Sequence, residues 1–225
     1  MGAMSVGDLK SKNRNFDNIL DSYLNLVDGG DLTGAVTFAG NQTLGDATTD
    51  AHTINGAVTV TSATGTAAGT GIDAVSPTVN VSTIGRDIVT EVFIDIGAGL
   101  ILSSGAANDV IGEDGVANAY VTKITTAING LVYAGEIICL EVPTTGDPDV
   151  NVCANASGTI AEDAAGDGEH TLANCGDHTL ALKTAFSIPA GGIQDDFIYL
   201  THGATVAGTY NAGKFLLRFF GTAVS

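Results

Sequence analysis

The chain has 225 residues, of which 44% are hydrophobic, enough apolar material for one sizeable packed domain, and this excludes global disorder. It carries 25 acidic and 8 basic residues and a formal net charge of −17, a surface that repels phosphate backbones, so we expect no nucleic-acid partner. No apolar run approaches the length of a membrane-spanning helix, so we expect no membrane partner either.

The first predicted element is an amphipathic helix in residues 1–30, a region that also has a basic start. Apolar residues recur at spacings of three and four, and the Gly29-Gly30 pair is expected to end the helix. Residues 1–14 hold three basic residues and one acidic residue, whereas residues 15–225 hold five basic and 24 acidic residues. The basic segment at residues 1–14 is either a docking arm for an acidic partner or a solvated tail. The residues assigned to partner binding as a docking arm are Lys10, Lys12, Arg14, Phe16, Ile19, Leu20, Tyr23 and Leu24.

Residues 31–84 contain two similar phrases, TGAVTF at Thr33–Phe38 and NGAVTV at Asn55–Val60. Two copies are too few for a stacked solenoid, which needs three or more units. We therefore expect an extended β-arm that includes a short strand at Thr78–Thr83. The stretch GTAAGTG at 65–71 lacks the glycine spacing and the lysine of a phosphate-binding loop, so a flexible loop is the preferred interpretation.

Residues 85–225 predict the main domain, an antiparallel β-sandwich or jelly roll with several strands and almost no helix. Glycine and threonine are abundant while lysine and glutamate are scarce, which favours strands and tight turns. Asn129-Gly130 predicts a hairpin turn before a strand. The predicted strands are Ile88–Ile96, Tyr120–Thr125, Leu131–Val142, Thr179–Phe186, Asp196–Leu200 and Lys214–Phe220.

The closing strand, KFLLRFF at Lys214–Phe220, is rich in large apolar residues on both faces. An exposed edge strand of this composition would invite aggregation. We therefore expect it to be central in its sheet or buried at a subunit contact.

Candidate chemistry gathers in the predicted loop region from Thr144 to Asp177 and just beyond it. Cys153 and Cys175 flank an acidic segment and could pair, although without a visible export signal reduced thiols are the default expectation. His170, Cys175 and His178 offer zinc ligands, but their spacing matches no standard structural pattern. EDAAGDGEH at 162–170 offers oxygen ligands in an order that departs from the EF-hand. An exposed polar loop is the preferred interpretation, with no cofactor and no dedicated metal site.

No pattern in the chain indicates an enzyme. There is no G-x-S-x-G nucleophile elbow, and nothing singles out two of the 25 acidic residues as a catalytic pair. Tryptophan is absent and aromatic residues make up only 6%, which weakens a carbohydrate-stacking groove. We expect a non-enzymatic protein.

Three segments carry a resemblance to a known group of proteins. TLGDATTDAHTINGAVTV resembles β-repeats of structural and fibre proteins of tailed bacteriophages. The run that begins IVTEVFIDIGAG at residue 88 and the ending DDFIYLTHGATVAGTYNAGKFLLRFFG resemble virion structural proteins of marine tailed phages. The resemblance covers most of residues 31–225 and implies a virion protein with no catalytic signature.

The resemblance leads us to expect a capsid decoration, or cement, protein. Such a protein binds the major capsid protein on the outer surface of the shell, as a homotrimer, after synthesis in the host cytoplasm. One alternative is a tail-fibre or head-fibre component with a trimeric β shaft. The other is a virion module that binds or degrades host-surface polysaccharide.

Overall fold

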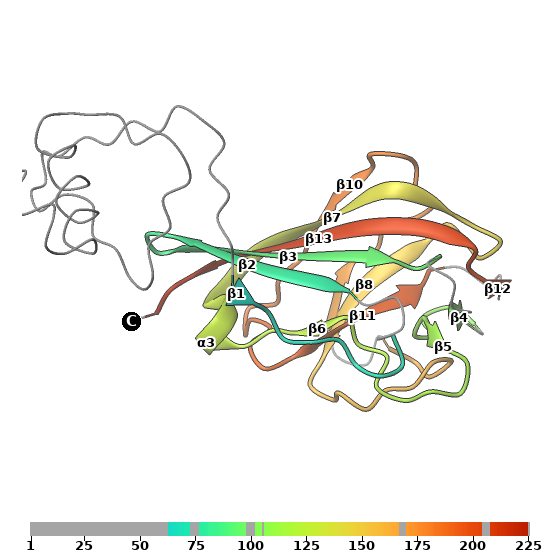
Figure 1. Ribbon diagram of the computed structural model, residues 1–225, viewed down its shortest axis with the longest axis horizontal. Coiled ribbons are helices and arrows are strands. Elements are labelled where there is room, and N and C mark those ends of the chain that lie inside the picture. The colour runs from blue at the N-terminus through green and yellow to red at the C-terminus, as the bar shows by residue number, and fades with distance from the viewer. Residues whose placement is uncertain are drawn as a thin grey trace, which may run out of the picture. The chain divides into compact units, whose positions relative to one another are not determined.

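The computed structural model describes residues 63–72, 77–97, 102–104, 106–166, 170–203 and 208–224, which belong to one compact unit, Thr59–Ser225. The described chain is mainly β and all its strand pairs are antiparallel, as expected from the sequence (Figure 1). The predicted N-terminal helix, and the predicted arm as far as residue 62, lie outside the described residues.

The largest sheet has six strands in the order β1-β2-β3-β13-β7-β10. Its long strands lie side by side in one layer (Figure 1). The strand β13, expected to be central or buried at a subunit contact, lies inside this sheet, between β3 and β7. The bounds are β1 Ala63–Thr64, β2 Thr78–Ile84, β3 Asp87–Asp95, β7 Leu131–Thr144, β10 Lys183–Ala185 and β13 Ala212–Thr222.

The strand β2 extends the six-stranded sheet further toward the N-terminus than the sequence indicates. It pairs with β3 along its whole length, from Thr78 opposite Phe93 to Ile84 opposite Asp87. The division predicted between residues 84 and 85 therefore falls in the turn of a hairpin. Gly85 has a φ of 65°, which explains the glycine in this tight turn. β2 is a strand of the main sheet, although the sequence assigns it to the arm.

A second sheet has four strands in the order β6-β11-β8-β9, and a small third sheet has the order β12-β4-β5. The strands β8 and β9 fall where the sequence predicts a loop, so that prediction is wrong. Every residue of β8 is buried, including the polar Asn151 and Asn155. Its six residues follow a turn-forming stretch with Gly146, Asp147 and Pro148, which favours a loop in the sequence. The bounds are β6 Thr122–Lys123, β8 Val150–Asn155, β9 His170–Ala173, β11 Phe197–His202, β4 Leu102–Ser104, β5 Gly112–Glu113 and β12 Gly208–Thr209.

The two larger sheets share one hydrophobic core. Ile94, Phe215 and Leu217 from the six-stranded sheet cluster with Val152 and Leu200 from the four-stranded sheet, and all five are fully buried. Alternation along each strand places these side chains on the inner face. Burial of each contributes about 1.5–3 kcal/mol to folding, so this core holds the two sheets together.

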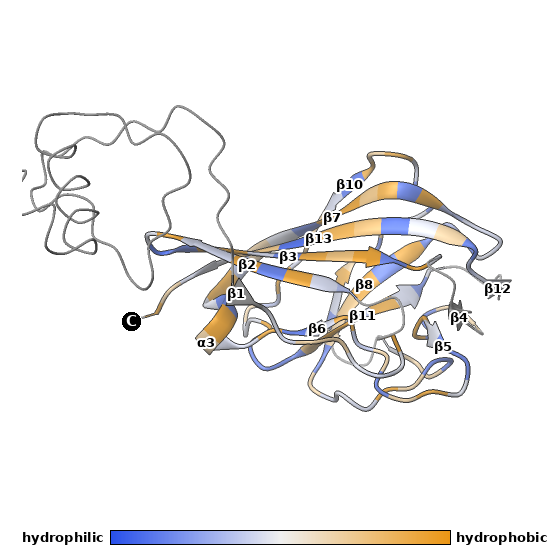
Figure 2. Ribbon diagram, viewed as in Figure 1, coloured by the Kyte–Doolittle hydropathy of each residue, from blue (hydrophilic) through white to orange (hydrophobic). Residues whose placement is uncertain are grey.

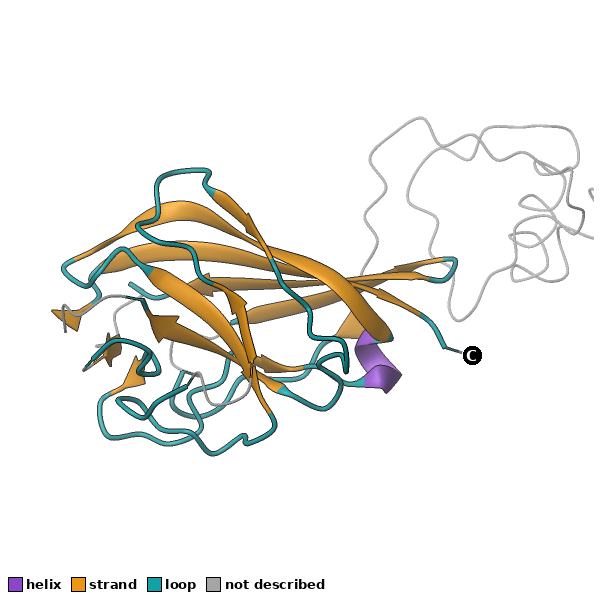
Figure 3. Cartoon of the chain, turned by 180° about the vertical axis from the view of Figure 1, so that it is seen from behind, coloured by secondary structure: helices purple, strands orange, loops and turns teal. Residues whose placement is uncertain are grey.

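The Asn129-Gly130 pair ends a helix, which corrects the hairpin predicted there. The helix α3, Thr126–Asn129, forms one turn before β7 and lies at one end of the sheet (Figure 3). The Thr125 hydroxyl accepts a hydrogen bond from the Ile128 amide at 3.3 Å, and Gly130 ends the turn with a φ of 66°. A glycine with positive φ suits a helix end as well as a hairpin turn. No helix in the described part of the chain is long and apolar enough to cross a membrane.

Replacing the buried Asn129 with alanine is expected to lower the free energy of unfolding by about 2 kcal/mol. Its side-chain oxygen accepts from the Thr125 amide at 2.7 Å, and its nitrogen donates to the Thr90 hydroxyl at 2.8 Å. The substitution leaves both partners without this bond in a site that water does not reach. Urea denaturation measures the loss, and Asn174→Ala, on an exposed loop, is the matched control. Equal stability of the two variants would contradict this role for Asn129.

Candidate functional site

The predicted partner-binding residues lie before the first described residue. Lys10, Lys12, Arg14 and the apolar residues from Phe16 to Leu24 are all among residues 1–62, outside the described part of the chain. Their role stays a prediction.

The candidate zinc ligands His170, Cys175 and His178 form no metal-binding cluster in the described residues. His178 is 2% exposed, and its Nε2 atom lies 2.8 Å from the Val150 carbonyl, which makes it a core side chain, not part of an exposed loop. No three histidine, cysteine or acidic side chains converge on a metal position anywhere in the described residues.

Cys153 and Cys175 are not joined in a disulfide. The Cys153 thiol donates to the Gly166 carbonyl at 3.0 Å, and burial raises the pKa of Cys175 to about 11. Cys175 is therefore a protonated, unreactive thiol at neutral pH.

The acidic segment at 162–170 is described only as far as residue 166 and at His170. Glu162 is buried, and its carboxyl group forms a hydrogen bond with that of Asp163. Burial, followed by this contact with Glu162, raises the pKa of Asp163. The described part thus combines a buried Glu162 with an exposed Asp163, and the candidate oxygen-ligand site gains no support from it.

A buried cluster of histidine and aspartate lies where β8 begins and β11 ends. His202 is completely buried, and its Nε2 atom lies 3.9 Å from the Asp147 carboxylate. The Asp149 amide donates to that same carboxylate at 2.8 Å. Burial, then the charges of Asp147 and Asp177, raise the pKa of Asp149. Because Asp147, His178 and His202 are less than a tenth exposed, the cluster holds the β7–β8 loop to the sheet and offers a substrate no access.

The pKa of His178 predicts how acid affects the fold. Burial holds this pKa below its ordinary value of 6.5, so the folded state favours the neutral imidazole. The unfolded chain takes up a proton near pH 6.5 and the folded chain does not. The contribution of the neutral His178 to the free energy of unfolding is therefore fully present above this pH. It is lost progressively as the pH drops below it. The raised pKa of Asp149 acts in the opposite direction at lower pH, where the folded state gains stability as Asp149 takes up its proton.

We expect the His178→Gln variant to lose less stability than the wild type between pH 7.5 and pH 5. Its free energy of unfolding in urea, measured at several pH values, should follow a flatter curve. Parallel curves for the two proteins would contradict the assignment to His178.

A shallow groove of about 260 Å³ lies between Leu131–Tyr133 of β7 and the loop at 188–192. Its lining includes Leu131, Val132, Ile188 and Pro189 but no charged side chain. It offers mainly hydrophobic contact, and Tyr133 is its one side chain with a polar group.

The most extensive candidate site is the outward face of the six-stranded sheet, which we call the outer sheet face. Alternation along the strands and the cross-strand register place its side chains on the side away from the core. Figure 2 shows the resulting hydrophilic and hydrophobic bands along β7 and β13. The outer sheet face consists of Val89, Glu91, Phe93 and Asp95 of β3, Lys214, Leu216, Arg218 and Phe220 of β13, Ala134, Glu136, Ile138 and Glu141 of β7, and Lys183 of β10.

Apolar and charged rows alternate across this face. Phe93, Leu216 and Ile138 lie opposite one another and form one apolar row. Phe220, with Val89 on one side, belongs to a second apolar row. A charged row lies between these two apolar rows. A second charged row lies on the other side of the apolar row that contains Leu216. The sequence signal for this pattern is the order Lys214, Leu216, Arg218, Phe220 at every second position of KFLLRFF, but only the register shows which neighbours complete each row.

Ion pairs satisfy the cations of the charged rows within the face. The Arg218 Nε atom donates to Glu91 at 2.8 Å, and Nη1 lies 3.6 Å from Glu136. Lys183 lies 3.0 Å from the other oxygen of Glu136, whose side chain is only 13% exposed. These contacts link β3, β13, β7 and β10.

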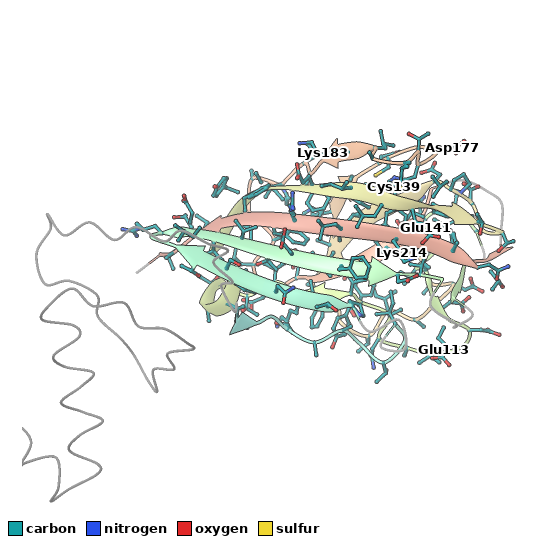
Figure 4. The ribbon with its side chains drawn as sticks, turned by 45° about the horizontal axis from the view of Figure 1, so that its top comes forward. Glu113, Cys139, Glu141, Asp177, Lys183 and Lys214 are labelled. Atoms are coloured by element: carbon teal, nitrogen blue, oxygen red, sulfur yellow. The ribbon has the colours of Figure 1, made fainter. Side chains whose placement is uncertain are left out.

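At the next charged row, Lys214 contacts Glu141 and lies 3.5 Å from Asp95 (Figure 4). Hydrogen bonding to Glu141 is the main cause of the raised pKa of Lys214. Lys214 thus stays charged over the whole neutral range. Exposed ion pairs of this kind add little stability individually, so the rows matter more for what the face can contact.

No family model, no curated protein and no solved structure matches this chain. The outer sheet face is therefore the observation on which a proposal of function rests.

Proposed function

We propose that this chain is a non-enzymatic structural protein of a virion, which binds the outer surface of the capsid shell as a homotrimer and stabilises it. The outer sheet face is the observation that carries the proposal. It is a broad surface on which the exposed Phe93 accompanies ion-paired side chains. Such a surface suits contact with another protein better than it suits chemistry on a small molecule.

The arrangement of the core supports the same proposal. Two antiparallel sheets that share one apolar core are typical of a β-sandwich or jelly roll, the class to which we assign residues 63–224. A rigid module of this kind can bear load through its packed core and its long central strands. The resemblance of IVTEVFIDIGAG and AGKFLLRFFG to phage virion proteins adds the viral context.

The N-terminal residues complete the proposal as a docking arm. Lys10, Lys12 and Arg14 would meet an acidic part of the major capsid protein, and the apolar residues from Phe16 to Leu24 would pack on it. Three arms on one trimer act together, so each can be weak while the trimer stays bound.

Two measurements test this function. The first is the copy number of the chain in purified particles that contain it: hundreds of copies support decoration, whereas a handful indicate a fibre. The second is binding of a variant that lacks residues 5–30 to shells stripped of the protein. We expect weaker shell binding and an unchanged unfolding transition for the described unit. Equal saturation of the shell by the truncated and full chains would overturn the docking arm.

A further inference from the structure

We infer that the outer sheet face is the surface through which copies of this chain contact one another. The inference rests on the proposed self-association and goes beyond it, because it names the surface and the side chains that form the contact. The partner is a second copy, with its own apolar and charged rows.

The outward sides of the two larger sheets differ in how far the chain itself covers them. The four-stranded sheet has a second apolar cluster outside the main core, in which Cys153 and Tyr199 of its strands pack with Val110 and Ala119 of the loops. On the six-stranded sheet, Phe93 remains 37% exposed and Leu140 42% exposed. One sheet is thus covered on both sides by its own chain, and the other still presents apolar side chains to solvent on its outward side.

The outer sheet face also differs in charge from the rest of residues 15–225. The outer sheet face holds three of the five basic residues found in residues 15–225, with four of their 24 acidic residues. The rest of that region is left with two basic and 20 acidic residues. Copies of so acidic a body repel one another at separations below the Debye length of about 8 Å. On the outer sheet face the charges nearly cancel, so two copies can approach there without that cost.

The charged side chains of the outer sheet face keep their partners when a second copy covers it. Arg218 already contacts Glu91 and Glu136, and Lys214 already contacts Asp95 and Glu141, so these cations need no new partner when water leaves. The apolar rows then supply the favourable burial. Strands about 4.8 Å apart with a rise of about 3.3 Å per residue give this four-strand face an area of roughly 450 Å². A standard interface buries about 800 Å² on each partner, so we expect the copies to separate on dilution.

Sedimentation velocity over a range of concentrations tests the inference on the full chain. Leu216→Glu places a charge in the middle of an apolar row and should weaken association of the copies about tenfold or more. Leu180→Glu makes the same change at a loop leucine that is 70% exposed and outside the outer sheet face. This control should associate like the wild type. Phe93→Glu is a second test of the face on a neighbouring strand, and circular dichroism checks that each variant is folded.

The outcomes separate the two proposals. A wild-type chain that stays monomeric at every concentration overturns self-association. A wild type that associates, with folded Leu216→Glu and Phe93→Glu variants that associate equally well, overturns the outer sheet face as the contact and leaves self-association standing. Loss of association in both face variants but not in Leu180→Glu supports the inference, whether the oligomer holds two copies or three.

Discussion

Replacing Phe215 with alanine is expected to lower the free energy of unfolding by about 3–5 kcal/mol, because the substitution opens a cavity in the shared core. Phe215 is completely buried in the central strand β13. It lies opposite Ile94 on one side and Cys139 on the other, and its ring packs edge-on against His178 with centroids 4.9 Å apart. Few neighbours can move into the space, since this strand is held between two others.

Phe93→Ala is the matched control for Phe215→Ala. It removes the same ring from the outer side of the neighbouring strand, where Phe93 is 37% exposed. Urea denaturation at low protein concentration, where association of copies does not contribute, should show a cost of about 1 kcal/mol or less. If the two alanine variants are equally destabilised, the assignment of inner and outer faces is wrong.

The second large effect is expected at Gly135. Replacing it with valine should lower the free energy of unfolding by about 3 kcal/mol, the upper end of the usual range for overpacked cores. The Phe186 ring lies over this glycine and packs against Phe219 at a centroid distance of 5.2 Å. A Cβ atom at Gly135 would lie 2.6 Å from the Arg218 carbonyl oxygen and closer still to the Phe186 ring. The ring would have to leave its place, and the backbone of β13 would be pushed from β7.

Gly191→Val tests whether valine is harmful only where space is lacking. A Cβ atom at Gly191 meets nothing within 4 Å. Thermal unfolding should therefore show a large drop for the Gly135 variant and little change for the Gly191 variant. Equal drops would mean that the cost comes from loss of glycine itself and not from Phe186.

Much of the six-stranded sheet could be predicted from the sequence, because its long strands alternate. Ile88–Ile96, Leu131–Val142 and Lys214–Phe220 lie within one residue of, or inside, the observed strands, and the central place of the last follows from its composition. The short strand β8 could not be predicted in this way, because its six residues lie between segments rich in glycine, aspartate and serine that favour turns.

The candidate site was harder to predict than its strands. The outer sheet face depends on which strands are neighbours, on their register and on a bulge near Lys214, and none of these is encoded locally. The buried cluster joins Asp147, His178 and His202 from three separate segments, so no spacing in the sequence indicates it. Residues whose partners are distant in the chain need the fold before a role can be assigned.

The central claim is that the outer sheet face of an assembly protein meets other copies of the same chain. Electron cryo-microscopy of the associated full-length protein, at a resolution that separates strands, tests it most directly. We predict three copies whose β3, β13 and β7 strands turn their outer side chains, with Leu216 at the centre, toward one another. An oligomer in which Leu216 and Phe93 face open solvent would contradict the claim.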